Sequence, residues 1–236
     1  MLSCRAIAAP TPVNFQPTTS PTAAPPPFHR DKGWRSIWHL STVRKRTSKE
    51  RGSLSNISNR VNCSFYYKIG ACRHGDKCSR KHVKPNYSVT MLIPNIYLNP
   101  AHDPACQLDS AQLQQHFDLF YEDMFAELAL KYGEVEEMIV CDNIGDHLIG
   151  NVYIRFRNEE AAGKAAEELN KRWYAGRPVF AELSPVTDFR ESCCRQYENG
   201  ECNRGGYCNF MHIKYPTRDL KKELWASQQE SLRNHK

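Results

Sequence analysis

The sequence has no long hydrophobic run. Nowhere in its 236 residues are there about 18 consecutive apolar residues, the length that a membrane-spanning helix needs. The first ten residues, MLSCRAIAAP, hold only a short apolar run, which is too weak for the hydrophobic segment of a secretory signal. These two absences exclude a membrane-spanning protein and argue against a secreted one, so we expect the cysteines to be in a reducing compartment.

Acidic residues are scarce in one part of the chain and basic residues in another. The segment from Cys63 to His82 has five Lys or Arg residues and a single acid, Asp76. Residues 118–137 have seven acids and a single base, Lys131. The net charge of +6 is compatible with an anionic partner. The separation of basic and acidic residues into different segments is more informative than this net charge. We expect a basic module and an acidic face that bind two different partners.

Residues 1–60 have too few apolar side chains to build a core. Half of the 14 prolines lie in the first 27 residues, and a basic Ser/Thr-rich stretch, VRKRTSKERGSLSNISNR, follows them. Such a composition cannot offset the entropy of ordering, which predicts disorder. Three interpretations remain open: a basic arm for nucleic acid or localisation, an organelle transit peptide, and a solvated tail without a specific role.

Seven of the ten cysteines fall in two blocks that nearly repeat each other, CSFYYKIGACRHGDKCSRKH at residues 63–82 and CCRQYENGECNRGGYCNFMH at residues 193–212. Each block ends in a histidine at a fixed spacing from the last cysteine. A disulfide framework does not require such a histidine, whereas a metal site does. Thiolate and imidazole ligands in closed four-coordinate sites suit zinc. We therefore predict two structural Zn²⁺ ions, because modules this small cannot fold on hydrophobic burial alone.

The predicted zinc ligands are Cys63, Cys72, Cys78 and His82 in the first block, and Cys194, Cys202, Cys208 and His212 in the second. Cys193 competes with Cys194 for the first position of the second block, and the sequence does not decide between them. Cys194 is preferred because it places Tyr197 three residues later, as Cys63 places Tyr66. We expect these two tyrosines to pack around the metal.

Aromatic and basic residues alternate with the predicted ligands. They are Phe65, Arg73, Lys77 and Arg80 in the first block and Arg195, Arg204 and Phe210 in the second. Such rings and guanidinium planes stack on unpaired bases while the cations contact phosphate. The blocks are therefore interpreted as RNA-binding zinc fingers, with a purely structural role for the zinc as the alternative.

Between the blocks, strand and helix patterns alternate from Tyr87 to about Val186. Strands are predicted at 89–98, 135–141, 148–156 and 178–183, and helices from Asp109 or Ser110 to Gly133 and over 158–173. The first helix has one apolar face, formed by Leu113, Phe117, Phe120, Met124 and Leu128. The order βαββαβ predicts a ferredoxin-like α+β sandwich, the architecture of RNA-recognition domains.

This central domain has lost much of the RNA-binding signature of that fold. In IGNVYIRF, Ile149 stands where a basic residue is expected and Asn151 where the first aromatic is expected. Pro94 interrupts the first strand. The helix instead presents Glu122, Asp123 and Glu127, and Arg172-Trp173-Tyr174 precedes the last strand. An exposed Trp beside Arg is typical of protein-binding hot spots; the alternative is that Trp173 caps the core and the acids are merely solvated.

From about Val61 to Tyr215 the chain resembles the small subunit of the U2 auxiliary factor, a family of pre-mRNA splicing factors. The resemblance is carried by KIGACRHGDKCSR, KYGEVEEM, GNVYIRF and ELSPVTDFRESCCRQYE. It implies a CCCH zinc finger at 61–86, a U2AF homology motif (a protein-binding variant of the RNA-recognition fold) at 87–186, and a second finger at 187–215. Residues 216–236 form a basic tail, in which a helix with a stripe of Leu220, Leu224 and Trp225 is expected to pack on the core.

The resemblance also implies the function. In this family the two fingers act together on the AG of the pre-mRNA 3′ splice site, the central domain binds the large subunit, and the complex promotes U2 snRNP recruitment in the nucleus with other spliceosomal proteins. The implied RNA-binding residues are Phe65, Arg73, Ser79, Arg80, Arg195, Gln196 and Phe210. The implied partner-binding residues are Glu122, Asp123, Glu127, Arg172, Trp173 and Tyr174, where Tyr174 replaces the usual Phe.

Two other functions compete with this interpretation. One is a generic CCCH regulator of message stability, which would bind RNA through the fingers alone. The other is a protein scaffold with purely structural fingers. An enzyme is not expected, because zinc with four protein ligands leaves no open position for water. The Arg/Ser-rich tail of many family members and their short segment before the first finger have no counterpart in this sequence.

Overall fold

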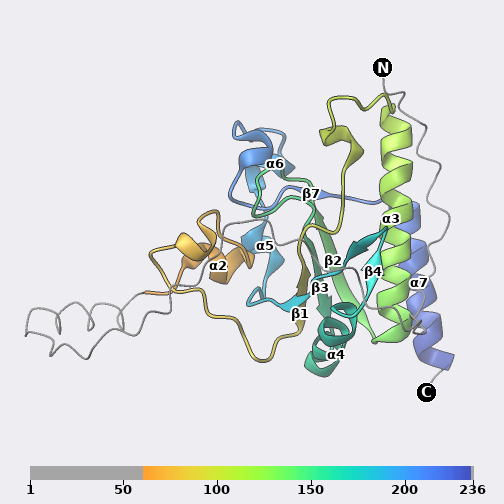
Figure 1. The fold of residues 1–236 in the computed structure, drawn as a ribbon. Coiled ribbons are helices and arrows are strands. Elements are labelled where there is room, and N and C mark those ends of the chain that lie inside the picture. Colours follow the sequence, from red (N-terminus) through yellow and green to blue (C-terminus); the bar gives the residue numbers. More distant parts are fainter. Residues whose placement is uncertain (1–60, 235–236) are drawn as a thin grey trace, which may run out of the picture. The chain divides into compact units, whose positions relative to one another are not determined.

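The computed structural model describes residues 61–234 (Figure 1). The predicted disorder of residues 1–60 lies outside the described residues. A five-stranded antiparallel sheet in the order β6-β1-β3-β2-β7 organises the chain. Its strands are β1 (Thr90–Ile93), β2 (Val135–Cys141), β3 (Val152–Phe156), β6 (Glu182–Leu183) and β7 (Ile213–Lys214). Together with helices α3 (Ser110–Lys131) and α4 (Glu159–Leu169) they give the βαββαβ order, so the predicted ferredoxin-like α+β fold is confirmed.

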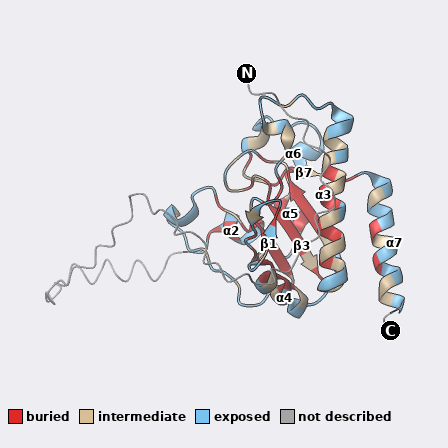
Figure 2. Ribbon diagram, turned by 45° about the vertical axis from the view of Figure 1, so that its right-hand side comes forward, coloured by how far each residue is buried: buried red, intermediate tan, exposed pale blue. Residues whose placement is uncertain are grey.

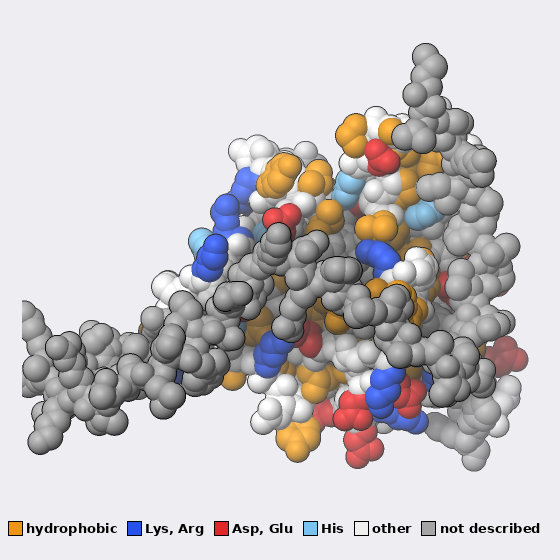
Figure 3. Space-filling view, viewed as in Figure 1, with side chains coloured by type: hydrophobic (Ala, Val, Ile, Leu, Met, Phe, Trp, Pro, Cys, Tyr) orange, Lys and Arg blue, Asp and Glu red, His pale blue; other side chains and the backbone are white. Residues whose placement is uncertain are grey.

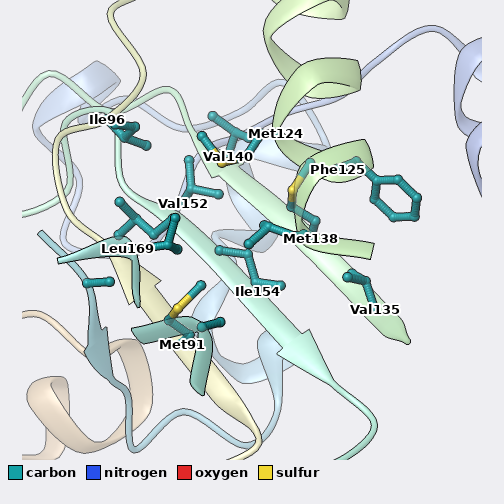
Figure 4. Packing of buried hydrophobic residues seen from close by; sticks show 14 of the residues in the cluster. Met91, Ile96, Met124, Phe125, Val135, Met138, Val140, Val152, Ile154 and Leu169 are labelled. Carbon is teal, nitrogen blue, oxygen red and sulfur yellow. The ribbon is translucent and has the colours of Figure 1, made fainter. Parts of the chain in front are cut away.

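Helix α3 begins at a capping box. The Asp109 carboxylate accepts from the backbone N–H of Gln112, whose side chain accepts from the N–H of Asp109. The sequence had left Asp109 and Ser110 open as caps, and the geometry selects Asp109. The predicted apolar face is buried from Phe117 to Leu128, against one face of the sheet (Figures 2 and 4).

Strand β1 is shorter than the predicted 89–98. It ends at Ile93 because Pro94 has no N–H to donate to a neighbouring strand, and Asn95 turns the chain with a φ of 59°. The chain then runs beside the residues that precede β3, where the N–H of Tyr97 donates to the carbonyl of Gly150 at 3.0 Å. A Cβ at Gly150 would lie 1.9 Å from the carbonyl oxygen of Tyr97, so this approach requires glycine.

The predicted strand at 178–183 is divided between two pairings. Strand β5 (Arg177–Pro178) forms a hairpin with β4 (Trp173–Tyr174), and only β6 joins the main sheet, beside β1. Positive φ at Ala175 and Gly176 provides the two-residue turn of the hairpin. The predicted helix over 158–173 therefore ends early, at Leu169, and Trp173 lies in an ordered hairpin after α4.

The C-terminal helix α7 (Arg218–Asn234) lies along α3, on the right in Figure 1. Leu224 is buried, and the ring of Trp225 packs on Phe125 with centroids 4.4 Å apart. The side chain of Gln228 bonds both backbone groups of Val135, at 2.9 and 3.0 Å. The predicted packing of the Leu220, Leu224 and Trp225 stripe is confirmed. None of the helices in the described part of the chain is long and apolar enough to cross a membrane.

Short helices flank the sheet. They are α2 (Ser64–Ile69), α5 (Phe189–Ser192) and α6 (Arg195–Glu198), with 3-10 helices η1 (Gly75–Lys77), η2 (Pro100–His102) and η3 (Gly205–Tyr207). Ile69 of α2 and Phe189 of α5 pack on the sheet face opposite α3, over the fully buried Tyr153. The face on which RNA-recognition domains stack bases is therefore covered by the chain's own segments.

Candidate zinc centres and interaction surfaces

The first Cys/His block folds around its predicted ligands. The ligand atoms of Cys63, Cys72, Cys78 and His82 all lie within 4.8 Å of one another. The sulfur of Cys72 is 3.7 Å from that of Cys63 and 3.9 Å from that of Cys78. Tetrahedral zinc with Zn–S bonds of ~2.3 Å separates its sulfurs by about 3.8 Å, so the spacing fits that ion.

The second block makes the same arrangement. Cys194, Cys202, Cys208 and His212 bring their ligand atoms within 4.8 Å of one another, with 3.8 Å between the sulfurs of Cys194 and Cys208. Cys193 is not in this group: it forms a backbone bridge with Met211 and packs against the core cluster beneath it. The geometry thus brings Cys194 to the site and directs Cys193 away from it.

The donor chemistry of both sites fits a bound cation. Nε2 of His82 and of His212 are buried and have no hydrogen-bond partner among residues 61–234, which is costly for a polar atom unless a metal or another group meets it. Burial raises the pKa of Cys72 to about 11, and a bound Zn²⁺ would offset that by stabilising the thiolate. The backbone N–H of Phe210 donates to the sulfur of Cys208 at 3.5 Å.

Tyrosines shield the two histidines from solvent. The ring of Tyr66 stacks on His82 with centroids 4.5 Å apart and planes 9° apart, and Tyr197 stacks on His212 at 3.9 Å and 11°. The expectation that these tyrosines pack around the metal agrees with this geometry. Stacking fixes the orientation of each imidazole, and a fixed orientation directs Nε2 toward the three sulfurs.

The two fingers contact each other directly. The rings of Phe65 and Phe210 meet edge to face with centroids 6.1 Å apart. Ser192 Oγ, which is fully buried, donates to the carbonyl of Lys68 at 2.5 Å, and the Lys68 ammonium is 3.2 Å from the Glu191 carboxylate. Segments 124 residues apart in the sequence therefore form one continuous surface.

A turn of the central domain holds the second finger. Asn143, which follows β2, is fully buried and makes three hydrogen bonds into the finger. Its amide nitrogen donates to the carbonyls of Cys208 at 3.3 Å and Phe210 at 3.1 Å, and its oxygen accepts from the N–H of His212 at 2.8 Å. Next to it, Ile144 packs on Gly206, where an added Cβ would lie 2.5 Å from Ile144 Cγ1.

Six of the seven predicted RNA-binding residues are exposed on the fingers, whereas Phe210 is half-buried and packs against the core cluster that contains Phe189. Phe65 is 39% exposed although it contacts Phe210. The polar members are exposed: Arg73, Ser79, Arg80, Arg195 and Gln196. Arg80 reaches Ser64 Oγ at 3.5 Å, and Gln196 accepts from Arg204 at 2.8 Å. Figure 3 shows Lys and Arg side chains gathered on the finger side of the face in view.

The acidic helix and the Arg-Trp-Tyr segment form one surface. Arg172 makes an ion pair with Glu127 on α3, and the Tyr174 hydroxyl bonds Asp123, also on α3. Burial raises the pKa of Asp123, and the Tyr174 hydrogen bond opposes that rise. Trp173 is 62% exposed, so it does not cap the core. The third predicted acid, Glu122, is exposed on the same helix.

Sequence reasoning missed the residues that position the fingers. Asn143 and Ser192 are polar side chains buried at the joints, yet in the sequence they look like ordinary turn and helix-end residues. The one signal in the sequence is DNIGD at residues 142–146, between the predicted strands 135–141 and 148–156, which is typical of a turn and names no partner. Only the tertiary structure shows that its amide bonds a finger 65 residues further along the chain.

Comparison with known proteins agrees with this geometry. The zinc finger family of the C-x8-C-x5-C-x3-H type matches residues 58–84 and 188–214. The U2AF 23 kDa splicing factor subunit of Schizosaccharomyces pombe is 62% identical over 174 residues, which cover 73% of this chain and 80% of that protein. The U2AF 26 kDa subunit of Homo sapiens is 56% identical, covering 71% of this chain and 79% of that protein.

The U2af 38 kDa splicing factor subunit of Drosophila melanogaster is 58% identical, over 71% of this chain and 66% of that protein. Among solved structures, the third RNA-recognition domain of Pes4 covers 43% of this chain and 96% of that chain at 11% identity, but its TM-score of 0.28 is too low to support an argument. The identities to these relatives, which cover 71% to 73% of this chain, show the family. This chain belongs to the U2AF small-subunit family of splicing factors and carries two zinc-binding CCCH fingers around an RNA-recognition-type domain.

Proposed function

We propose that the paired fingers bind the AG dinucleotide at the 3′ splice site of pre-mRNA. In this proposal Phe65 and Phe210 offer aromatic surface to the bases, and the cations Arg73, Arg80 and Arg195 contact the phosphates. Ser79 and Gln196 supply hydrogen-bonding groups that read base edges. The zinc ligands proposed for this role are the eight residues that the structure clusters, four in each finger.

One observation carries this proposal: the fingers form a single surface while the sheet is covered. Tyr153 and Phe156, the two aromatics of the RNA-binding signature that remain in IGNVYIRF, are both fully buried, and the ring of Phe189 packs on Tyr153. Base stacking on the sheet is therefore blocked by the protein itself. The edge-to-face contact of Phe65 with Phe210 supports the proposal, because it keeps the two fingers close enough to bind adjacent nucleotides.

The second part of the proposal is heterodimerisation with the U2AF large subunit. The surface consists of Asp123 and Glu127 on α3, with Glu122 beside them, and of Arg172, Trp173 and Tyr174 in the hairpin. The ion pair and the Tyr174–Asp123 bond fix the hairpin on the helix. An exposed tryptophan on a fixed support loses little entropy on binding, as is typical of hot spots. We further propose that the complex acts in the nucleus, without an enzymatic step, alongside other spliceosomal proteins.

The experiment is a comparison of RNA affinities. The full chain, loaded with zinc and bound to a large-subunit segment, is titrated with a uridine-rich RNA that contains AG and with one that contains CG, at one fixed salt concentration. We expect a clear preference for AG that Gln196→Ala lowers, whereas Arg195→Ala should weaken the binding of both RNAs alike, because it removes a phosphate contact. Equal affinities that fall steeply with salt would mean that phosphate contacts dominate, and a scaffold or a general RNA-binding regulator would replace the proposal.

A further inference from the structure

Gln196, one of the proposed RNA-binding residues, is held by a second residue of the same finger. It is exposed in the short helix α6, two residues after the zinc ligand Cys194. Its side-chain oxygen accepts a hydrogen bond from the guanidinium of Arg204 at 2.8 Å. Arg204 lies two residues after the next ligand, Cys202. The pair therefore connects the two turns of the chain that carry the first two ligands of this finger.

The loop between these turns brings the pair together. It folds back at Gly200, whose φ of 76° favours glycine, and the N–H of Glu201 donates to the carbonyl of Gln196 at 2.7 Å. The guanidinium of Arg204 also hydrogen-bonds the sulfur of Cys202. Hydrogen bonds of this kind around a metal ligand fix the groups that make them. Arg204 is thus held at the zinc site while it bonds Gln196.

The chemistry of this pair decides which way the Gln196 carboxamide faces. A guanidinium carries N–H donors and no acceptor, so only the carboxamide oxygen can face Arg204. The amino group, with its two donors, then points away from Arg204. A carboxamide without such a partner turns about its last torsion and presents either its oxygen or its amino group. In this finger, Gln196 therefore presents donors to a ligand.

The first finger has no such pair at the equivalent positions. Phe65 lies two residues after Cys63, and His74 lies two residues after Cys72. A phenyl ring stacks on a base but forms no directional hydrogen bond with its edge. The repeat thus has a stacking side chain in the first finger where the second finger has a side chain that donates.

A group that only donates distinguishes adenine from cytosine, the two bases that differ between AG and CG. Adenine presents its ring nitrogen N7 as an acceptor, whereas the corresponding edge of cytosine presents its amino group, a donor. A carboxamide that turns freely would accept from that amino group through its oxygen. Holding the oxygen on Arg204 removes this option, so the wrong base loses a hydrogen bond that it would otherwise form.

We propose that Arg204 is a positioning residue, which holds the Gln196 carboxamide so that it donates to N7 of the adenine of AG. This role rests on the proposed binding of AG by the fingers and adds to it the direction of the hydrogen bond that Gln196 makes. Because Arg204 also bonds a sulfur ligand, the second zinc centre supports the side chain that selects the base.

The test measures the ratio of two affinities, so that a general loss of RNA binding does not affect it. The full chain, with zinc and a large-subunit segment, is titrated at one fixed salt concentration with RNAs that contain AG or CG. We expect Gln196→Ala to lower the AG-to-CG ratio about fivefold, the factor that corresponds to one hydrogen bond of ~1 kcal/mol. Gln196→Glu keeps the shape of the side chain and its bond to Arg204 but has no donor, so the ratio should fall as far.

A modified RNA tests the acceptor atom directly. Replacing the adenine by 7-deazaadenine, which lacks the N7 acceptor, should weaken binding to the unaltered protein about fivefold. The same replacement should leave the affinity of Gln196→Ala unchanged, because this variant has no donor to lose.

Variants of Arg204 separate positioning from direct contact. Arg204→Ala should lower the AG-to-CG ratio, but should not lower it further in a chain that already carries Gln196→Ala, because Arg204 acts through Gln196. Arg204→Lys keeps a donor for the carboxamide oxygen and should retain most of the ratio. Asn203→Ala changes an exposed neighbour and should keep the full ratio, and zinc content is measured for every variant.

A full AG-to-CG ratio in Gln196→Glu, or in Arg204→Ala with zinc bound in both fingers, would overturn the positioning role. A further fall when Arg204→Ala is added to Gln196→Ala would also overturn it. If Arg204→Ala loses zinc, Arg204→Gln decides in its place: its carboxamide still donates to the Cys202 sulfur but also accepts from Gln196, so the ratio should fall. Absence of an AG preference in the unaltered protein would instead refute the proposed function.

Discussion

Asn143→Ala tests whether the central domain holds the second finger in its folded form. The substitution removes three hydrogen bonds from a fully buried site and leaves two carbonyls and one N–H of the finger without partners. Each such bond contributes a net ~1 kcal/mol, with a larger cost where the remaining group stays buried. We expect the free energy of unfolding to fall by about 2–4 kcal/mol, a large share of the stability of an ordinary domain.

The same substitution should weaken zinc binding in one finger only. Asn143 bonds the carbonyl of Cys208 and the N–H of His212, and both residues are in the second ligand group. Because metal binding and finger folding are coupled, the second finger should release its zinc at a lower chelator concentration than in the unaltered protein. The first finger, which Asn143 does not contact through these bonds, should retain its zinc.

The assay combines urea unfolding with chelator competition, in which released zinc is followed with a colorimetric indicator. Asn203→Ala, an exposed residue of the same finger, is the matched control and should behave as the unaltered protein. Asn143→Asp keeps the acceptor for His212 but places an oxygen against two carbonyls, so it should not restore stability. If Asn143→Ala leaves both the unfolding free energy and the zinc release unchanged, the finger folds without the turn and the reasoning is wrong.

Three other predictions concern the partner surface and the metals. Trp173→Ala should weaken binding of a large-subunit segment by more than about 1 kcal/mol in calorimetry, since exposed tryptophans dominate such interfaces, without lowering the melting temperature; unchanged affinity would place Trp173 outside the interface. Tyr174→Phe removes a donor to the Asp123 carboxylate, so the pKa of Asp123 should rise further in an NMR titration; an unchanged or lower pKa would refute the bond. Chelation should remove hydrogen-exchange protection from both fingers and from β7, which directly follows His212, while β1 and β3 remain protected; persistent finger protection would contradict the ligand assignment.

Much of the fold was predictable because local patterns and packing agree. The apolar spacing from Phe117 to Leu128 predicted the buried face of α3, and the repeated Cys/His spacing predicted two ligand groups that the structure assembles. In both cases a short stretch of sequence determines the outcome. Helical periodicity follows from local geometry in any fold, and the ligands of a small zinc finger lie close together in the sequence.

The strand ends were less predictable, because pairing partners decide them. The apolar run at 89–98 continues past Ile93, but the structure has no strand partner there and the chain turns at Asn95. Strand β7 joins β2 through residues that the sequence assigned to the second finger. Two-residue strands carry no pattern of their own, so their pairing is visible only after the sheet has formed.

The fixed arrangement of the fingers explains why a whole domain separates two copies of one small module. His82 and Cys194 are 112 positions apart in the sequence, and a flexible linker of that length would leave them about 60 Å apart on average. At such separations the second finger would gain little from the binding of the first. Here the contacts of Lys68 with Ser192 and Glu191, together with the Phe65–Phe210 ring pair, hold the fingers together before RNA binds. The entropy cost of bringing the two fingers together is therefore met during folding and not during RNA binding. In the proposed function, the two fingers can then bind RNA as one surface.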